Sequence, residues 1–108
     1  MNTISTETRF AYRHKPTGKW VYIYLSHHTK PKLYMLFRDD FHTEILYSAR
    51  NIIEEDLFSS IDCDQHYGEK YAALHFDEFE LVEIKIEYKI KQEYVEIKIH
   101  ESPTGWPN

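Results

Sequence analysis

The sequence predicts an α+β fold: a twisted antiparallel β-sheet of four to six strands with one main α-helix packed on one face. Three observations predict it. Two runs rich in aromatic and β-branched residues, 9–15 and 19–25, flank a Pro-Thr-Gly turn. Apolar residues recur every three or four positions between Ala49 and Ser60. Apolar and charged residues then alternate from residue 79 to residue 100.

The chain has 108 residues, which indicates a single domain over 1–108. A chain of this size buries about two-thirds of its surface on folding, enough for a core without disulfides. Residues 1–8 are polar, and 101–108 combine Ser, Pro and Gly. We expect both ends to be flexible tails, unless Trp106 docks.

The first hairpin turns at Pro16–Gly18, where Pro favours a type I turn and Gly a left-handed residue closing a bulge. A three-residue loop would pair Lys15 with Lys19 and His14 with Trp20. One face would then hold five aromatic residues and a histidine, namely Phe10, Tyr12, His14, Trp20, Tyr22 and Tyr24. The other face would hold Arg9, Ala11, Arg13, Val21, Ile23 and Leu25.

The middle of the chain predicts a buried strand at 33–37 and the helix. Asn51 and Glu54 have the spacing of a capping box inside the helix range Ala49–Ser60. Residues 43–47 fit a strand or a helix start, and residues 59–69 read as loop. Residues 70–75 fit either a helical turn or an edge strand.

Charge selects the register of the C-terminal hairpin. A two-residue loop would place Glu87 opposite Glu96, whereas a four-residue loop, 91–94, places Glu87 opposite Lys98. Each opposite-charge pair contributes roughly 0.2–1 kcal/mol, so the four-residue loop is favoured. The same register stacks Ile90 on Val95, Tyr88 on Ile97 and Ile86 on Ile99.

Composition narrows the class of protein. A net charge of −5 is the wrong sign for a general nucleic-acid binder. The sequence contains no apolar run of about 20 residues, so we expect no membrane span, and no secretory signal is visible at its start. One cysteine, Cys63, fits a reducing compartment, and we expect a cytoplasmic protein.

Metal and catalytic motifs are absent from the sequence. Cys63 and His66 come closest to the spacing of metal ligands. A structural zinc site usually has a second close pair of ligands, and the sequence has seven histidines but no second cysteine. His27 and His28 lie in a stretch of loop composition. Asp62 and Asp64 would raise the pKa of the Cys63 thiol, which argues against a thiolate nucleophile. We therefore predict no metal, no cofactor and no enzyme activity.

The aromatic hairpin is the candidate binding site, formed by Tyr12, Arg13, His14, Trp20, Tyr22 and Tyr24. Basic residues are concentrated in the same third of the chain, and aromatic platforms beside cations bind nucleotides or single strands. The alternative is that these aromatic side chains are core. The two readings differ in whether Tyr12, Trp20 and Tyr22 are exposed with a cation nearby.

The segment Arg13–Gly18 and the aromatic strand after it resemble the opening of small uncharacterised proteins of tailed bacteriophages. The resemblance covers residues 9–25 and implies an accessory protein acting in an infected bacterial cytoplasm, where such proteins often inhibit a host or defence protein. Together with the missing catalytic motifs, it favours a non-catalytic inhibitor acting by protein–protein contact. The alternative is a protein that sequesters a nucleotide or single-stranded nucleic acid through the hairpin.

The C-terminal strands also suggest assembly. Their Glu-Lys-Glu-Lys pattern is complementary to itself when antiparallel, so a strand at the sheet edge could pair with a second copy. We expect a homodimer, with strand addition by a host protein as the alternative.

Overall fold

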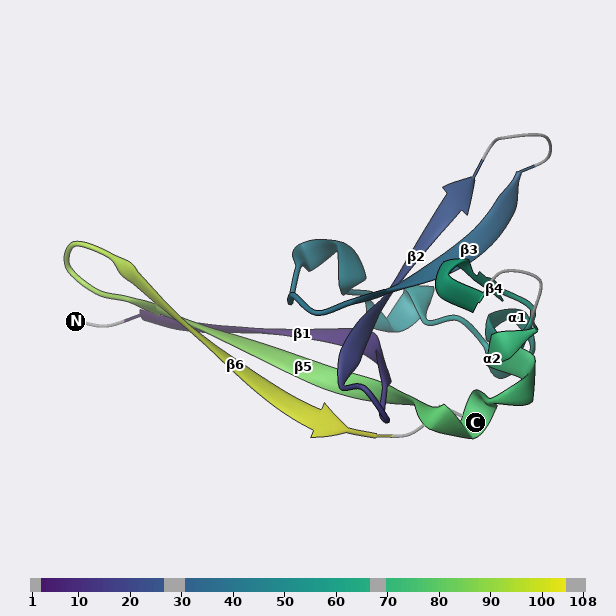
Figure 1. Cartoon of the computed structure of the whole chain (residues 1–108). Helices are drawn as coiled ribbons and strands as arrows, with labels where there is room; N and C mark the ends of the chain where they lie inside the picture. The colour runs from purple at the N-terminus through teal and green to yellow at the C-terminus, as the bar shows by residue number, and fades with distance from the viewer. Residues whose placement is uncertain (1–2, 27–30, 67–69, 105–108) are drawn as a thin grey trace.

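The computed structural model of the chain describes residues 3–26, 31–66 and 70–104. Within these residues, six strands form one sheet in the spatial order β4-β3-β2-β1-β5-β6 (Figure 1). The strands are β1 (Thr3–His14), β2 (Lys19–Ser26), β3 (Lys32–Arg38), β4 (Asp62–Cys63), β5 (Phe79–Ile90) and β6 (Val95–Pro103). Neighbours are antiparallel except β3 and β4, which are parallel. The sheet-rich fold is as predicted, but the sheet is mixed, because the chain crosses over between β3 and β4.

Short helical segments replace the single helix predicted over Ala49–Ser60. The α-helices are α1 (Glu55–Ser59) and α2 (Tyr71–Leu74), and the 3-10 helices are η1 (Thr43–Ile45), η2 (Ala49–Asn51), η3 (Asp64–His66) and η4 (Phe76–Glu78). The backbone is extended at Ile52 and at Glu54, which is the N-cap of α1. The predicted capping box is therefore wrong, since the helix begins after both of its residues.

Packing explains why the apolar stripe is not one helical face. Ile45 belongs to a cluster on one side of the sheet, while Ile52 and Phe58 pack on the other. The chain crosses the sheet beside β1, where Phe10 and Tyr47 exchange two backbone hydrogen bonds of 2.8 and 2.7 Å. A continuous helix from Ala49 to Ser60 does not form: Phe58 is in the core and Ile52 and Ile53 pack against it, whereas Leu57 is 50% exposed.

The register of the first hairpin differs from the prediction by one residue. Arg13 lies opposite Trp20 and His14 opposite Lys19, so four residues form the turn. The Gly18 N–H donates to the His14 carbonyl (2.8 Å), with Gly18 at φ 70°. Lys15 leaves the β1–β2 ladder because its N–H donates to the Glu78 carbonyl instead (2.8 Å).

The register of the C-terminal hairpin matches the prediction. Ile90 lies opposite Val95, Glu87 opposite Lys98 and Lys89 opposite Glu96. Strands β1 and β6 are longer than expected: β1 begins at Thr3, and β6 continues to Pro103. Residues 3–8 and 101–103, assigned above to tails, are therefore paired with β5. Trp106, His27 and His28 lie outside the described residues.

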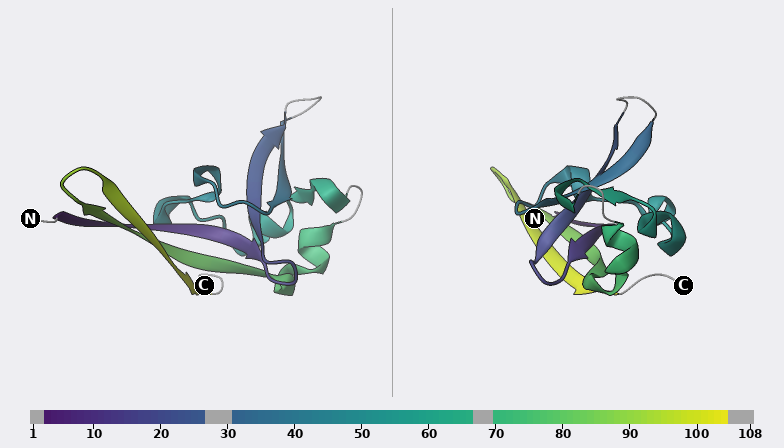
Figure 2. Two further views of the ribbon diagram at one scale, coloured as in Figure 1. Left: turned by 60° about the vertical axis from the view of Figure 1, so that its left-hand side comes forward. Right: turned by 45° about the vertical axis from the view of Figure 1, so that its right-hand side comes forward.

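The molecule has two regions, which are separated clearly in the left view of Figure 2. We call residues 3–8 and 85–100 the arm: here β1, β5 and β6 form a three-stranded ribbon that projects from the rest. The remaining described residues form the head, in which β2 and β3 cross over β1 and the helical segments pack on the sheet. The long dimension of 55 Å, against 29 and 26 Å, reflects the arm.

The head buries apolar side chains on both faces of its sheet. One cluster includes Tyr12, Val21, Met35, Phe58 and Phe79. The other, across the sheet, includes Ala11, Trp20, Ile45, Val82 and Ile84. Ile45 lies in the cluster on one side and Phe58, Ile61 and Tyr71 lie in the cluster on the other, which is why buried residues occur on both faces of the hairpin.

Candidate functional site

The six predicted site residues do not share one face. The shifted register places Tyr12 and His14 on one side of the sheet, and Trp20, Tyr22 and Tyr24 on the other with Arg13. The predicted binding face of the hairpin is therefore wrong as a single surface, because a one-residue slip moves a strand's side chains to the opposite face.

Tyr12 and Trp20 are core residues. Tyr12 is fully buried, packs against Phe58 and accepts a hydrogen bond from the Ile53 N–H through its hydroxyl. Burial raises the pKa of Tyr12. Trp20 is 6% exposed and meets Phe41 edge-on, with the guanidinium of Arg13 5.3 Å from its ring. Neither ring is open for stacking on a base.

The Arg13 side chain of β1 forms ion pairs with β5 and with β6. Its guanidinium is bonded to Glu80 of β5 (2.7 Å) and to Glu101 of β6 (2.9 Å). With its side chain only 20% exposed, Arg13 is engaged by carboxylates and by Trp20. Its position indicates a structural role at the base of the arm.

Three tyrosines form a ladder on one face of β2 and β3. Tyr24 stacks on Tyr22 (centroids 5.8 Å apart) and on Tyr34 (5.9 Å). Each of the three rings is half-buried. Burial, with Asp64 as the next cause, raises the pKa of Tyr24. This ladder is the aromatic surface closest to the predicted one, although Tyr34 was not among the predicted residues.

Cations lie over both ends of the ladder, but acids accompany them. Arg38 lies 5.7 Å from the Tyr22 ring and bonds to Asp40 and Glu44. Lys32 lies 5.7 Å from the Tyr34 ring and bonds to Asp62. The ladder thus presents aromatic area with little net positive charge.

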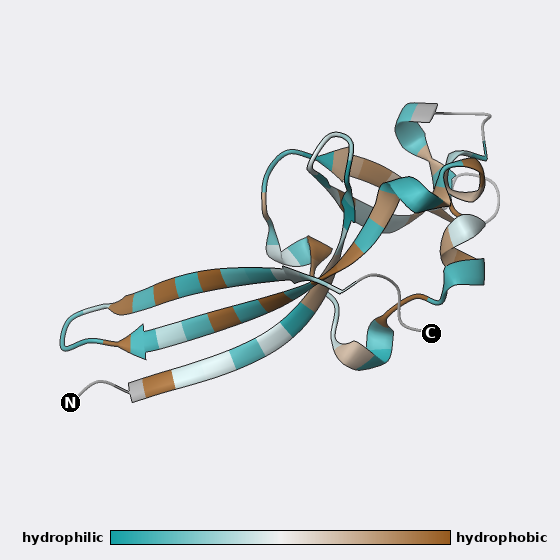
Figure 3. Ribbon diagram, turned by 90° about the horizontal axis from the view of Figure 1, so that it is seen from below, coloured by the Kyte–Doolittle hydropathy of each residue, from teal (hydrophilic) through white to brown (hydrophobic). Residues whose placement is uncertain are grey.

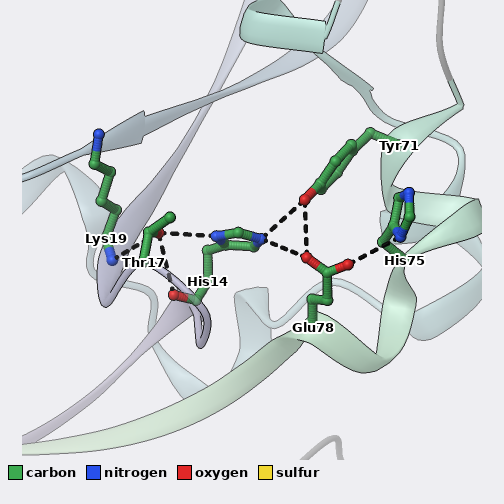
Figure 4. A network of polar contacts seen from close by, with 6 residues as sticks. All are labelled: His14, Thr17, Lys19, Tyr71, His75 and Glu78. Carbon is green, nitrogen blue, oxygen red and sulfur yellow. Dashed lines mark hydrogen bonds and ion pairs between the residues drawn. The ribbon is translucent and has the colours of Figure 1, made fainter.

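A buried polar network lies on the opposite face, centred on His14 (Figure 4). The His14 Nε2 lies 3.0 Å from Glu78 Oε1 and 3.1 Å from the Tyr71 hydroxyl, which itself donates to Glu78 Oε1 (2.9 Å). On the other side of the ring, Nδ1 lies 2.8 Å from Thr17 Oγ1. His14 is 3% exposed and stacks on Phe37. The network joins the hairpin turn to α2 and η4.

The carboxylate of Glu78 is the anchor of this network. Its Oε2 also lies 2.9 Å from His75 Nδ1. The Tyr71 hydrogen bond is the largest cause that lowers the pKa of Glu78, followed by the hydrogen bond from His14. Glu78 therefore stays ionised and accepts from two buried donors, as buried polar groups require.

The order carboxylate, imidazole, hydroxyl resembles a nucleophile array, with Thr17 at the end. The Thr17 oxygen, however, accepts from the Lys19 N–H (3.3 Å) and lies 3.4 Å from the His14 carbonyl. These are the contacts of a side chain that stabilises its own turn. We assign the network a structural role: it fixes the turn against the helical cap.

Sequence reasoning named His14 but missed Tyr71, His75 and Glu78. The available signal was a histidine on an otherwise apolar strand face, which needs a buried hydrogen-bond partner. Nothing in the local sequence indicates that residues more than 55 positions away supply it.

The arm carries the third candidate surface. Tyr88, Ile90, Val95, Ile97 and Ile99 share one side of the ribbon, which we call the arm face. Its four aliphatic residues are 46–57% exposed. The alternating hydrophobic bands of β5 and β6 are visible in Figure 3, and in Figure 1 no helix of the described residues lies over the outer end of the ribbon. Ile86, the next residue on this face toward the head, is 8% exposed.

Comparison with family models, curated proteins and solved structures returned no significant match. Across residues 3–26, 31–66 and 70–104, no helix is long and apolar enough to cross a membrane. In the same ranges, no three His, Cys, Asp or Glu side chains are grouped as metal ligands, and Cys63 is buried.

Proposed function

We propose that the protein is a non-catalytic binding protein that inhibits a bacterial host or defence protein by direct contact through the arm face. The observation that supports this is the row of half-exposed aliphatic side chains on β5 and β6. An uncovered apolar face next to a well-packed core is typical of an interaction surface.

The surroundings of the arm face also fit a protein partner. On the same side of the ribbon, β1 supplies Ser5, Glu7 and Arg9, and Glu7 accepts a hydrogen bond from Tyr88 (3.1 Å). The face thus has an apolar centre and a polar rim, the usual anatomy of a protein–protein interface. The occupant we expect is a folded protein that presents an apolar ridge.

The test is affinity capture from bacterial lysate with three proteins. Wild type and Lys85→Gln, which changes the opposite, charged side of the arm, should retain one stoichiometric partner. Ile90→Lys should lose it, because a charge would be buried within the apolar contact. Absence of a stoichiometric partner, or equal capture by all three proteins, would contradict the proposal.

A second candidate function is binding of a nucleotide or single-stranded nucleic acid, favoured by the tyrosine ladder and its two cations. Base stacking on tyrosine contributes about 1–3 kcal/mol per base. The paired acids and the net charge of −5 weigh against it. Fluorescence titration with nucleotides and oligothymidine should show saturable quenching that Tyr34→Ala reduces; an unchanged signal would remove this candidate.

A further inference from the structure

The outer edge of the arm is β6, a nine-residue strand paired only with β5 among the described residues. β5 lies between β1 and β6, so the Glu83–Lys89 stretch, whose charge pattern first suggested assembly, is not at an edge. A long free edge strand is a template for pairing with another chain.

Two backbone hydrogen bonds show which groups face outward. Lys91 N–H donates to the Tyr94 carbonyl (2.8 Å), and Thr104 N–H donates to the Leu81 carbonyl (2.9 Å). These bonds flank the pairs Ile90↔Val95 and Val82↔Pro103, so both pairs are non-hydrogen-bonded. Because the two types of pair alternate, the odd-numbered residues of β6 direct their backbone N–H and C=O groups to the free edge. Pro103, which has no N–H, also stands at such a position, as expected on an edge strand.

We infer that two copies of this chain pair antiparallel through β6, with the two-fold axis at Ile97. In this register Val95 lies opposite Ile99 of the second copy, and Glu96 lies opposite Lys98 of the second copy. The two-fold axis makes each of these pairs occur twice in the dimer. Every edge-directed donor from Val95 to Ile99 meets an edge-directed acceptor. Apolar side chains meet on the arm face, and opposite charges meet on the other side.

Neighbouring registers fit less well. A shift that centres the axis on Lys98 places the two Lys98 side chains opposite each other. A shift to Ile99 places Ile97 opposite Glu101. Since like-charge pairs destabilise a ladder and opposite-charge pairs stabilise it, the axis at Ile97 is selected.

The arm's other free edge, β1 up to Arg9, is a poorer template. The next edge-directed residue, Phe10, already has both backbone groups bonded to Tyr47. On the arm-face side β1 presents Ser5 and Glu7, so pairing there would join no apolar surface. Pairing through β6 instead makes one six-stranded sheet in which two arm faces are continuous. The inference does not depend on the proposed host partner.

The test uses two single variants, Glu96→Lys and Lys98→Glu, studied alone and mixed one to one. Each variant alone should dimerise at least about tenfold more weakly than wild type, because two attractive pairs become two repulsive ones. The mixture should recover the dimer, because both contacts of a mixed dimer are attractive: the introduced Lys at position 96 faces the introduced Glu at position 98, and the native Lys98 of the first variant faces the native Glu96 of the second. Mass is read by light scattering at micromolar concentration, with circular dichroism to check folding.

A wild-type mass near 13.1 kDa, a dimer that neither variant weakens, or a mixture that gains nothing would each overturn the inference. If the substitutions loosen the hairpin, amide hydrogen exchange of wild type decides. Protection of Val95, Ile97 and Ile99 should increase with protein concentration, while Glu96 and Lys98 stay protected throughout. Fast exchange of the odd-numbered amides at every concentration would overturn it. Loss of the host partner with Ile90→Lys, away from this edge, is a separate result.

Discussion

The head and the arm use the same alternating strand pattern with opposite outcomes. On β5, Ile84 and Ile90 point to the same side of the sheet, yet Ile84 is fully buried and Ile90 is 48% exposed. The difference lies in Ile45 and Leu46, which pack in the cluster that holds Ile84 and ends at Ile86 and Tyr88, and which leave Ile90 uncovered. Alternation therefore specifies which side of a strand is apolar, while cover from elsewhere in the chain decides whether that side is core.

The largest expected difference comes from placing the same charge in both regions. Ile84→Lys should destabilise the protein by about 4 kcal/mol or more and leave it largely unfolded, because an unpaired ammonium would be buried. Ile90→Lys should change stability by no more than about 0.5 kcal/mol. Urea denaturation followed by circular dichroism measures both, and equal losses would show that the arm is as tightly packed as the head.

Alkaline pH provides a second test of head packing. Burial, followed by the nearby Tyr12, raises the pKa of Tyr47 to about 12. Since this pKa is above that of an unfolded tyrosine, near 10, the neutral phenol stabilises the fold below pH 10. That stability should be lost as the pH rises toward 12. Ultraviolet titration of tyrosinate in wild type and Tyr47→Phe checks it, and a Tyr47 that ionises near pH 10 would contradict the packing.

Removing one hydroxyl from each region should have a smaller effect. Tyr71→Phe breaks the bonds to Glu78 and His14 in the head and should cost about 1–3 kcal/mol, because buried partners lose a donor. Tyr88→Phe breaks the bond to Glu7 in the arm and should cost about 0.5 kcal/mol. Thermal denaturation compares the two variants. A larger loss of stability in Tyr88→Phe than in Tyr71→Phe would contradict a stabilising role for the His14 network.

The smallest effect is on acid stability. Tyr71 and His14 hold the pKa of Glu78 below its usual range, so Glu78 contributes stability above the unfolded carboxyl pKa, and this is lost as the pH falls through the folded value. Tyr71→Phe should move the Glu78 carboxyl midpoint upward in a carbon-detected NMR titration. Tyr88→Phe is the control and should leave that midpoint unchanged.

Interactions between residues close in sequence were sufficient to predict the register of the C-terminal hairpin. Cross-strand charge at Glu87 and Lys98 selected the observed register, because both strands and their loop are adjacent in sequence. The same reasoning failed by one residue at the first hairpin. There Lys15 bonds to Glu78, a residue whose proximity no local pattern reveals.

The helix and the site depended on contacts distant in sequence. Ile45 and Phe58 follow a helical spacing, but the chain has to cover both sides of the sheet between them. Likewise His14 was named from its strand, whereas Tyr71 and Glu78 reach it through the fold. The sequence predicted that one side of these two strands is apolar. It did not predict that this side is exposed, because exposure depends on whether residues distant in sequence pack over it.

The most direct test of the uncovered arm face is methyl NMR with a soluble paramagnetic probe. In the free protein, the methyl signals of Ile90, Ile97 and Ile99 should broaden strongly, and those of Ile84 and Ile45 should not. Pairing through the β6 edge leaves the face open, so this pattern should hold in the dimer as well. Equal protection of Ile90 and Ile84 would show that the arm face is covered, and would contradict the account of the arm as an interaction surface.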